Sequence, residues 1–160
     1  MAAMTAAKGG LDVILADEDF IMGGRLNAET IEVGGMRGSD WAAATVAELS
    51  GMPNVRLMPR TTVTGAYDGG TYAALQRVSH HMAQAPENVP LETFWRIVAR
   101  RTILAAGAIE RPIAFPNNDR PGIMMASAVR SYANRFAVAP GQRVTVFTNN
   151  DDGHRTALDL

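Results

Sequence analysis

The chain has 160 residues, of which 47% are hydrophobic and 19% are charged, a composition typical of a globular domain and not of a disordered chain. The net charge of -1 provides no basic surface, so we expect no nucleic-acid partner. The lack of cysteine excludes disulfides, iron–sulfur clusters and thiol catalysis, and favours a cytoplasmic protein. No apolar run approaches the ~20 residues that span a bilayer, so no membrane partner is expected.

The first third of the chain predicts short helices and strands in alternation. Residues 1–10 favour a helix of about two turns that ends at a glycine pair. An apolar strand is expected over 11–16, directly before three acids. After a loop with a second glycine pair, Ser39 or Asp40 can cap a helix over 41–49. Helix, glycine, strand and acid is the order of the second half of a βαβ unit.

The middle of the chain has the alternating pattern of β-structure. Residues 54–78 predict a β-meander, with the turn signal Asp68-Gly69-Gly70 between two alternating segments. The polar, proline-containing residues 79–92 predict a loop, and strands are expected again within 93–107, including one from Thr102 to Ala105. The remaining expected elements are a helix over 123–136, a strand over 144–147 and a helix within 152–160.

Both ends of the chain fall inside a strand–turn–helix unit, and a parallel sheet without its first strand would expose unpaired backbone edges. We therefore expect an α/β protein with an incomplete Rossmann-like dinucleotide-binding fold and a β-meander, in a fragment of a larger subunit. The predicted domains are a partial first dinucleotide-binding domain that includes the meander, over 1–136, and the start of a second, degenerate dinucleotide-binding unit, over 137–160.

Three stretches have the residue types of a nucleotide site. Asp17 ends a buried strand, where an acid can accept hydrogen bonds from ribose hydroxyls; a solvated acid is the alternative. The pair Gly23-Gly24 can let a backbone approach a ligand, or can form only a flexible turn. The small residues Ala105-Ala106-Gly107 leave room at a strand end for a cofactor, or for tight packing of the strand on a helix.

Two histidines have the chemistry of metal ligands but not the spacing. His80 and His81 are adjacent, so on a helix their side chains would point about 100° apart. No carboxylate pattern of a ligand set accompanies them, so we predict no metal site. The sequence identifies no catalytic residue.

The longer motifs resemble a known family. The order of "VILAD", "GGRL", the meander "NVRLMPRTTVTGAYDGG" and "RRTILAAGAIERPIAFPNNDRPGIM" is similar to that of the two-dinucleotide-binding-domain flavoprotein superfamily. The strings "AAGAIERPIAFPNNDRPG" and "VTVFTNNDDGHRTALDL" resemble more closely the alpha subunits of heterotetrameric sarcosine oxidases. The resemblance covers nearly all of this chain, but only an internal portion of that longer subunit.

The resemblance implies cofactor-binding roles for particular residues. Asp17, with Glu18 as the neighbouring alternative, corresponds to the ribose-binding acid. Gly23-Gly24-Arg25 corresponds to the loop near the adenosine and the pyrophosphate. The backbone of Val63 corresponds to an adenine contact, and Ala106-Gly107 to a contact between the strand end and the dinucleotide.

Three departures from the family pattern affect these roles. The first Gly-x-Gly-x-x-Gly loop is not among these residues, so we expect the isolated chain to bind NAD weakly or not at all and to be inactive. At the second strand–turn–helix, Thr148, Asn150 and Gly153 occupy the glycine positions, so we expect no pyrophosphate there. The superfamily's strand-end motif is Ala-Thr-Gly, where this chain has Ala105-Ala106-Gly107.

The implied function is that of part of an oxidoreductase subunit. The complex would demethylate sarcosine oxidatively to glycine with production of hydrogen peroxide. NAD would bind in the alpha subunit, FAD and FMN on the beta subunit or at its interface, and the partners would be beta, gamma and delta subunits. The alternatives are a subunit of a related amine, opine or proline dehydrogenase, and a scaffold with no bound nucleotide.

Overall fold

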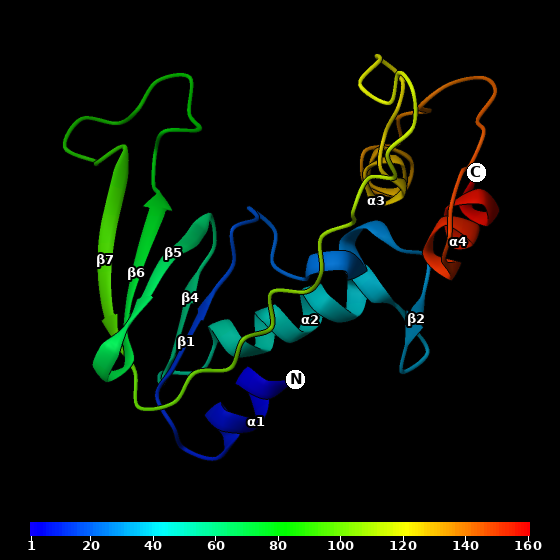
Figure 1. Ribbon diagram of the computed structural model, residues 1–160. Coiled ribbons are helices and arrows are strands. Elements are labelled where there is room, and N and C mark those ends of the chain that lie inside the picture. Colours follow the sequence, from blue (N-terminus) through cyan, green and yellow to red (C-terminus); the bar gives the residue numbers. More distant parts are fainter. The chain divides into compact units, whose positions relative to one another are not determined.

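The computed structural model describes residues 1–160 and divides them into two compact units (Figure 1). Unit 1 comprises Met1–Met22 and Ala43–Ala105, and unit 2 comprises Gly23–Ala42 and Ala106–Leu160. None of the helices combines the length and the apolarity needed to cross a membrane. The predicted division at residue 136 concerns nucleotide-binding domains, and it stays a prediction.

Unit 1 begins with helix α1 (Ala2–Lys8) and strand β1 (Val13–Ala16), as the sequence predicts. Strand β4 (Val55–Met58) pairs with β1 in parallel, and it follows helix α2 (Gly38–Ser50), whose last residues belong to unit 1. A parallel pair requires such a crossover connection. Apolar side chains of α1, α2 and both strands form the core: Met4, Ala7, Val13, Leu15, Leu49, Val55 and Leu57.

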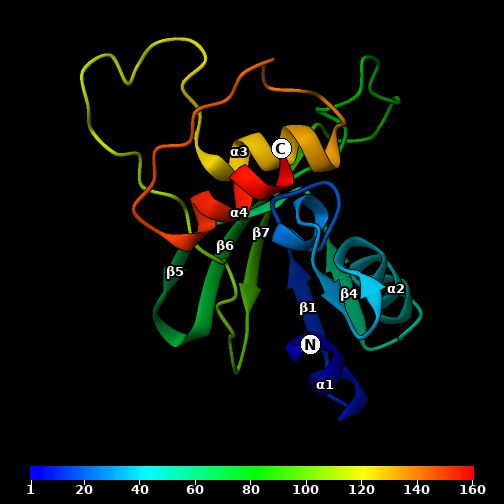
Figure 2. The ribbon, with the colours of Figure 1, turned by 90° about the vertical axis from the view of Figure 1, so that its right-hand side faces the viewer.

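The rest of unit 1 is a three-stranded antiparallel sheet in chain order (Figure 2), so a meander is present, but over Thr61–Val98 and not over the predicted residues 54–78. Its strands are β5 (Thr61–Tyr67), β6 (Thr71–Arg77) and β7 (Glu92–Val98). The predicted turn lies between β5 and β6, where Gly69 and Gly70 have φ of 68° and 69°. These angles favour glycine over residues with a Cβ atom.

Unit 2 is built from short elements. The 3₁₀-helix η1 (Gly24–Ala28) precedes a hairpin of β2 (Glu32–Val33) and β3 (Met36–Arg37). Helix α3 (Ala126–Arg130) continues into the single-turn π-helix η3 (Ser131–Arg135). Helix α4 (Asp151–Asp159) contacts α3, and the Thr156 hydroxyl lies 3.4 Å from the Ala126 carbonyl oxygen.

Several predicted elements are wrong in position or type. The sequence predicts residues 55–58 in the meander, but they pair in parallel with β1 because their apolar side chains complete the core with α1 and α2. The strands expected over 102–105 and 144–147 are not formed, since neither segment has a hydrogen-bonded neighbour in any of the sheets. The helix expected over 123–136 begins at Ala126, and α2 begins before its predicted cap residues.

Candidate functional site

The predicted cofactor-binding residues belong to both units. The sequence-predicted residues of unit 1 are Asp17, Glu18 and Val63, and those of unit 2 are Gly23, Gly24, Arg25, Ala106 and Gly107. The geometry of each group is therefore described within its own unit.

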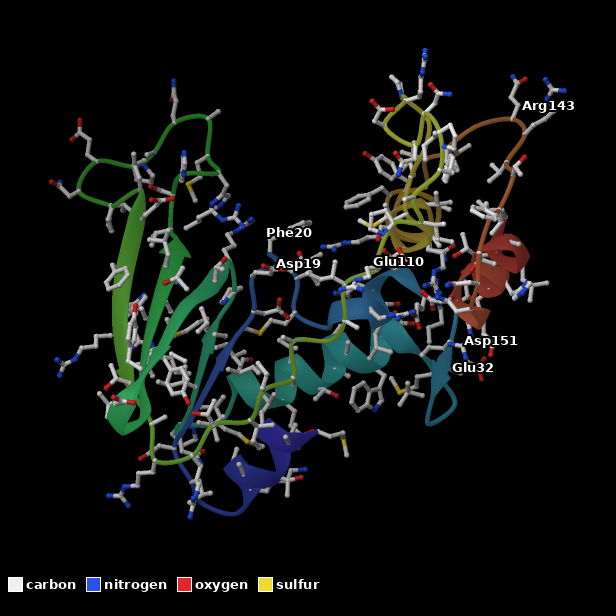
Figure 3. All side chains as sticks on the ribbon, in the orientation of Figure 1. Asp19, Phe20, Glu32, Glu110, Arg143 and Asp151 are labelled. Carbon is white, nitrogen blue, oxygen red and sulfur yellow. The ribbon has the colours of Figure 1, made fainter.

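In unit 1, Asp17 is fixed directly after β1, where its backbone continues the sheet. Its N–H donates to the Met58 carbonyl at 3.1 Å, and its own carbonyl accepts from the Thr61 N–H at 2.8 Å. The half-buried Asp17 carboxylate accepts the Asp19 N–H at 3.0 Å through one oxygen, and its other oxygen has no hydrogen-bond partner. Asp19 and Phe20, labelled in Figure 3, continue this turn.

The position of Asp17 fits the role of a ligand acceptor better than that of Glu18. Ligands of open α/β sheets bind beyond the carboxyl ends of parallel strands, and Asp17 stands at the carboxyl end of β1. Hydrogen bonds hold the Asp17 backbone on both sides, and the Asp19 N–H holds one carboxylate oxygen. The other oxygen is thus already oriented, so the side chain loses little conformational entropy when a ligand binds. Glu18 is exposed, and its side chain has no polar contact.

Val63 lies on β5, at the edge of the meander. It is opposite Ala74 of β6, and the register shifts just after it, between Val63 and Gly65. Its side chain is 51% exposed. Because β5 has a strand on only one side within this sheet, some of its backbone groups are open to a ligand, as the predicted adenine contact requires.

In unit 2, the pair Gly23-Gly24 lies at the start of η1, and local packing explains why the first of the two positions requires glycine. Gly23 has φ of 142°, and a Cβ atom there would lie 2.9 Å from the Asn27 side chain and 3.0 Å from Cβ of Ala42. Gly24 has φ of 55°, and a Cβ there would meet nothing within 4 Å. The need for glycine at the first position therefore follows from packing within unit 2, whereas the predicted ligand contact stays a prediction.

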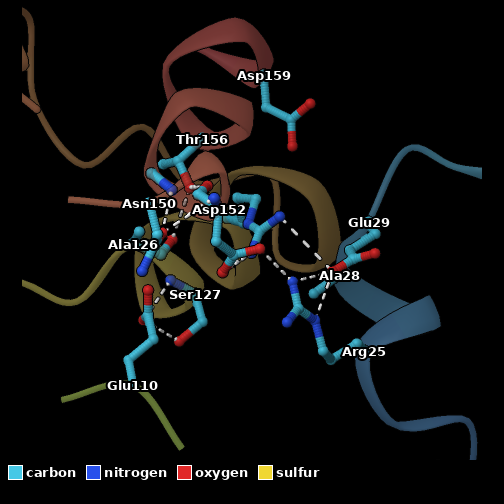
Figure 4. A network of polar contacts seen from close by, with 12 residues as sticks. Arg25, Ala28, Glu29, Glu110, Ala126, Ser127, Asn150, Asp152, Thr156 and Asp159 are labelled. Carbon is cyan, nitrogen blue, oxygen red and sulfur yellow. Dashed lines mark hydrogen bonds and ion pairs between the residues drawn. The ribbon is translucent and has the colours of Figure 1, made fainter. Parts of the chain in front are cut away.

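The side chain of Arg25 belongs to a network of two cations and two anions (Figure 4). Its Nη2 lies 2.5 Å from Asp152 Oδ1, and its Nε donates to Glu29 Oε1 at 2.6 Å. On the other side, Arg130 Nη2 donates to Asp152 Oδ2 at 2.8 Å, and its Nη1 lies 3.6 Å from Glu29 Oε1. The Arg130 side chain is only 3% exposed, whereas that of Arg25 is 52% exposed.

The network shifts the protonation equilibria of two members. The hydrogen bond to Asp152, with smaller contributions from Glu29, raises the pKa of Arg25, although burial opposes this shift. Burial by itself would raise the pKa of Asp152, but the hydrogen bonds and charges of Arg25 and Arg130 outweigh it and lower that pKa. Asp152 is therefore a carboxylate at neutral pH. The positive charge of Arg25 is already balanced by Asp152 and Glu29, so it is not available to pair with a pyrophosphate.

We expect the stability of unit 2 to fall in acid because of Asp152. Its pKa is lowered in the folded chain, so its stabilising contribution is complete above the unfolded value of about 3.9 and is lost as the pH falls through the lower folded value. Denaturant unfolding measured from about pH 5 to pH 2 should show a smaller loss of stability in Asp152→Asn than in the natural chain. An identical pH dependence in both proteins would show that the network does not stabilise the fold.

The N-terminus of α4, at the predicted second nucleotide turn, is already capped. Asn150 Oδ1 accepts the N–H groups of Asp152 and Gly153 at 3.0 and 3.3 Å. Thr148 Oγ1 accepts the Asn150 N–H at 3.2 Å, and a Cβ atom at Gly153 would overlap the Thr148 side chain. These bonds use amides that an anion would need. The absence of a pyrophosphate from this turn stays a prediction that the geometry favours.

The small residues Ala106 and Gly107 are exposed and lie outside any helix or strand. Gly107 has φ of 71°, and a Cβ there would meet nothing within 4 Å. The strand end that they were expected to form does not exist, so only the open space beside Gly107 agrees with their predicted role. No group of three or more histidine, aspartate or glutamate side chains is placed to hold a metal ion.

Comparison with known proteins gives matches along nearly the whole chain. No family model matches. The sarcosine oxidase subunit alpha of Rhizobium meliloti (strain 1021) is 46% identical over 159 residues, which cover 99% of this chain and 16% of that protein. The subunit of the same name from Corynebacterium sp. (strain P-1) is 42% identical over 161 residues, covering 99% and 17%.

The chain is homologous to a segment of the sarcosine oxidase alpha subunit. The resemblance seen in the sequence motifs is confirmed, and so is the expectation that they match a portion of a longer subunit. The chain spans about a sixth of the length of the alpha subunits that it matches.

A solved structure of another protein resembles this chain in fold. The crystal structure of L-proline dehydrogenase from P.horikoshii superposes with a TM-score of 0.69 and 24% identity, over 88% of this chain and 27% of that one. At this identity the likeness concerns the fold alone, and it confirms the predicted mixed α/β class.

The centre of the unit 2 network was not predicted from the sequence. The resemblance indicates Arg25, but no sequence pattern indicates Arg130 or Glu29. Arg130 is one cation on a short helix with no motif around it, and an acid such as Asp152 is common at a helix N-terminus because of the macrodipole alone. The only signal in the sequence was that α4 begins with two acids, Asp151 and Asp152, in addition to the capping Asn150.

Proposed function

We propose that this chain forms part of an NAD-binding module in the alpha subunit of a sarcosine oxidase-like complex. The observation that carries the proposal is the 41–46% identity to alpha subunits over 99% of the chain. The geometry adds a parallel strand–helix–strand arrangement, β1–α2–β4, with a fixed acid at the carboxyl end of β1. A Rossmann-like half would contain such a strand–helix–strand unit, which supports the proposal.

Within this module, the residues of the chain bind and orient the ligand. The unpaired oxygen of Asp17 would accept a ribose hydroxyl, and the open edge of β5 at Val63 would meet the adenine. Gly24 and Gly107 leave space for close approach, because nothing lies near a Cβ at either position. Arg25 fits this role less well, since its charge is already balanced by Asp152 and Glu29. No residue of this chain is assigned to catalysis.

The activity of the whole complex is proposed from the names of the relatives. It would convert sarcosine, oxygen and water into glycine, hydrogen peroxide and formaldehyde. With tetrahydrofolate as the acceptor of the one-carbon unit, methylenetetrahydrofolate would form instead and no water would be consumed. Beta, gamma and delta subunits would be the partners, with FAD and FMN on the beta subunit or at its interface, in the cytoplasm. The identity to sarcosine oxidase alpha subunits favours this substrate over a dehydrogenase substrate, since the likeness to the proline dehydrogenase concerns the fold alone.

Removal of the Asp17 carboxylate tests the module. In the full-length alpha subunit that contains this chain, Asp17→Ala should weaken NAD binding about 10- to 150-fold, the equivalent of one charged hydrogen bond. Retained NAD is measured after gel filtration and denaturation of the purified subunit. Glu18→Ala is the matched control and should retain NAD as the natural subunit does, because Glu18 is exposed.

Two results would argue against this assignment. If Glu18→Ala loses NAD and Asp17→Ala does not, the ribose contact is one residue further along the chain. If the unmutated subunit releases no NAD on denaturation, the module is a scaffold without nucleotide.

A further inference from the structure

A basic cavity lies in unit 1, close to the turn after β1. It has a volume of about 250 Å³, and its lining residues are Arg60, Arg77, His80, His81 and Glu92. The two arginines and the one glutamate give a net charge of +1 before any histidine is protonated. None of these residues belongs to the proposed NAD contacts.

Arg60 is held in this cavity in an unusual backbone conformation. It has φ of 55°, in the left-handed region that disfavours residues with a Cβ atom. Its N–H donates to the Asp19 carbonyl at 2.9 Å, and its carbonyl accepts the Arg77 N–H at 3.0 Å. Its guanidinium lies over the Phe20 ring, 5.1 Å from the centroid, and has no hydrogen-bond or ion-pair partner. The Arg60 guanidinium is thus placed with unpaired N–H donors on a strained backbone. Residues with such strained backbone conformations cluster at ligand sites.

Arg77 contributes a second set of donors at the end of β6. Its Nη2 donates to the Glu18 carbonyl at 3.3 Å, which orients the guanidinium and leaves its other N–H groups unpaired. Arg77 is directly opposite Glu92 in the register of β6 and β7. Glu92 is instead paired with His80, whose Nδ1 lies 3.2 Å from Glu92 Oε1. Neither arginine forms an ion pair with Glu92, so the one carboxylate of the cavity offsets only part of their charge.

The turn that carries the two histidines is anchored from inside. Ser79 is fully buried, and its hydroxyl donates to the Pro90 carbonyl at 2.9 Å. The N–H groups of Val78, Ser79 and His80 all point to the Leu91 carbonyl, at 2.9, 3.1 and 3.2 Å. The position of His80 and His81 at the cavity is therefore fixed by the backbone.

We propose that this cavity binds a phosphate group, as free phosphate or as a small phosphate monoester. Two planar guanidinium groups with unpaired donors match the oxygens of a phosphate, which accept charge-assisted hydrogen bonds. Imidazole N–H groups from the anchored turn add neutral or charged donors. The volume admits a phosphate with a small organic group attached. This inference does not depend on NAD binding.

The test is an NMR titration of the 160-residue chain with inorganic phosphate and, separately, with glycerol phosphate, at constant ionic strength. Both should shift the amide signals of Arg60, Arg77 and His80 along one binding curve. Arg77→Gln should weaken binding about 10- to 150-fold, the effect of one charged hydrogen bond. Glu92→Gln should strengthen it, because a carboxylate beside the phosphate is removed. Arg96→Gln is the matched control, since Arg96 is exposed on β7, about 13 Å along the strand from Glu92.

Arg60→Gly separates binding from folding. Glycine relieves the left-handed strain, so the variant should be at least as stable as the natural chain and should lose phosphate binding. Loss of binding with stability kept supports the site. Equal effects of Arg77→Gln and Arg96→Gln, or shifts spread over all exposed arginines, would overturn the proposal and leave only a solvated basic surface.

Discussion

Replacement of Arg130 by methionine is expected to lower the free energy of unfolding by about 3 kcal/mol, the lower end of what the loss of one partner of a buried ion pair costs. The Arg130 side chain is 3% exposed and is paired with Asp152 and Glu29. Methionine fills similar space but leaves both carboxylates with less compensation. Arg130 Nε is buried without a partner, and its removal offsets part of the loss, which is why the expected value lies at the lower end of that range.

Arg25→Met is the matched control for this prediction. It removes the same charge from the same network, but the Arg25 side chain is 52% exposed, so its loss should cost less than about 1 kcal/mol. Urea unfolding of both variants, with amide exchange of α3 and α4 as the report on unit 2, distinguishes them. Equal stability losses in the two variants would mean that burial does not set the strength of this network.

The sequence predicts best those elements whose signals are local. The glycine stop of α1, the turn at Asp68–Gly70 and the start of α4 each depend on a few consecutive residues, and each appears where expected. The acid after β1 was also identifiable, because an apolar strand followed by acids is a local pattern.

The errors concern interactions between distant residues. An apolar segment is a strand only if another strand bonds to it, and the segments over 102–105 and 144–147 have none. Residues 55–58 join β1 and not the meander because α1 and α2 supply the apolar side chains that cover them. Arg25 and Asp152 are 127 residues apart, so no spacing rule could have paired them.

Gly153→Ala is expected to destabilise unit 2 by about 2 kcal/mol, within the range for inserting a methyl group into a packed site. A Cβ atom at position 153 would overlap Cβ and Oγ1 of Thr148. Thr148 cannot move away easily, because its hydroxyl donates to the Asn150 carbonyl and accepts the Asn150 N–H. In a Thr148→Gly background the same substitution should cost less than about 0.5 kcal/mol, which denaturant unfolding of the four proteins in the cycle measures.

This cycle also tests why the turn keeps its one glycine. In a dinucleotide fingerprint the glycines admit the pyrophosphate and close packing of the helix on the strand. If Gly153 served mainly to admit a ligand, alanine would leave stability unchanged in both backgrounds. If alanine lowers stability strongly and this loss disappears when Thr148 is replaced, Gly153 is needed to pack against Thr148. Thr148 in turn holds Asn150, whose side chain accepts the N–H groups of Asp152 and Gly153. The packing that requires glycine here is then the same packing that closes this turn to an anion.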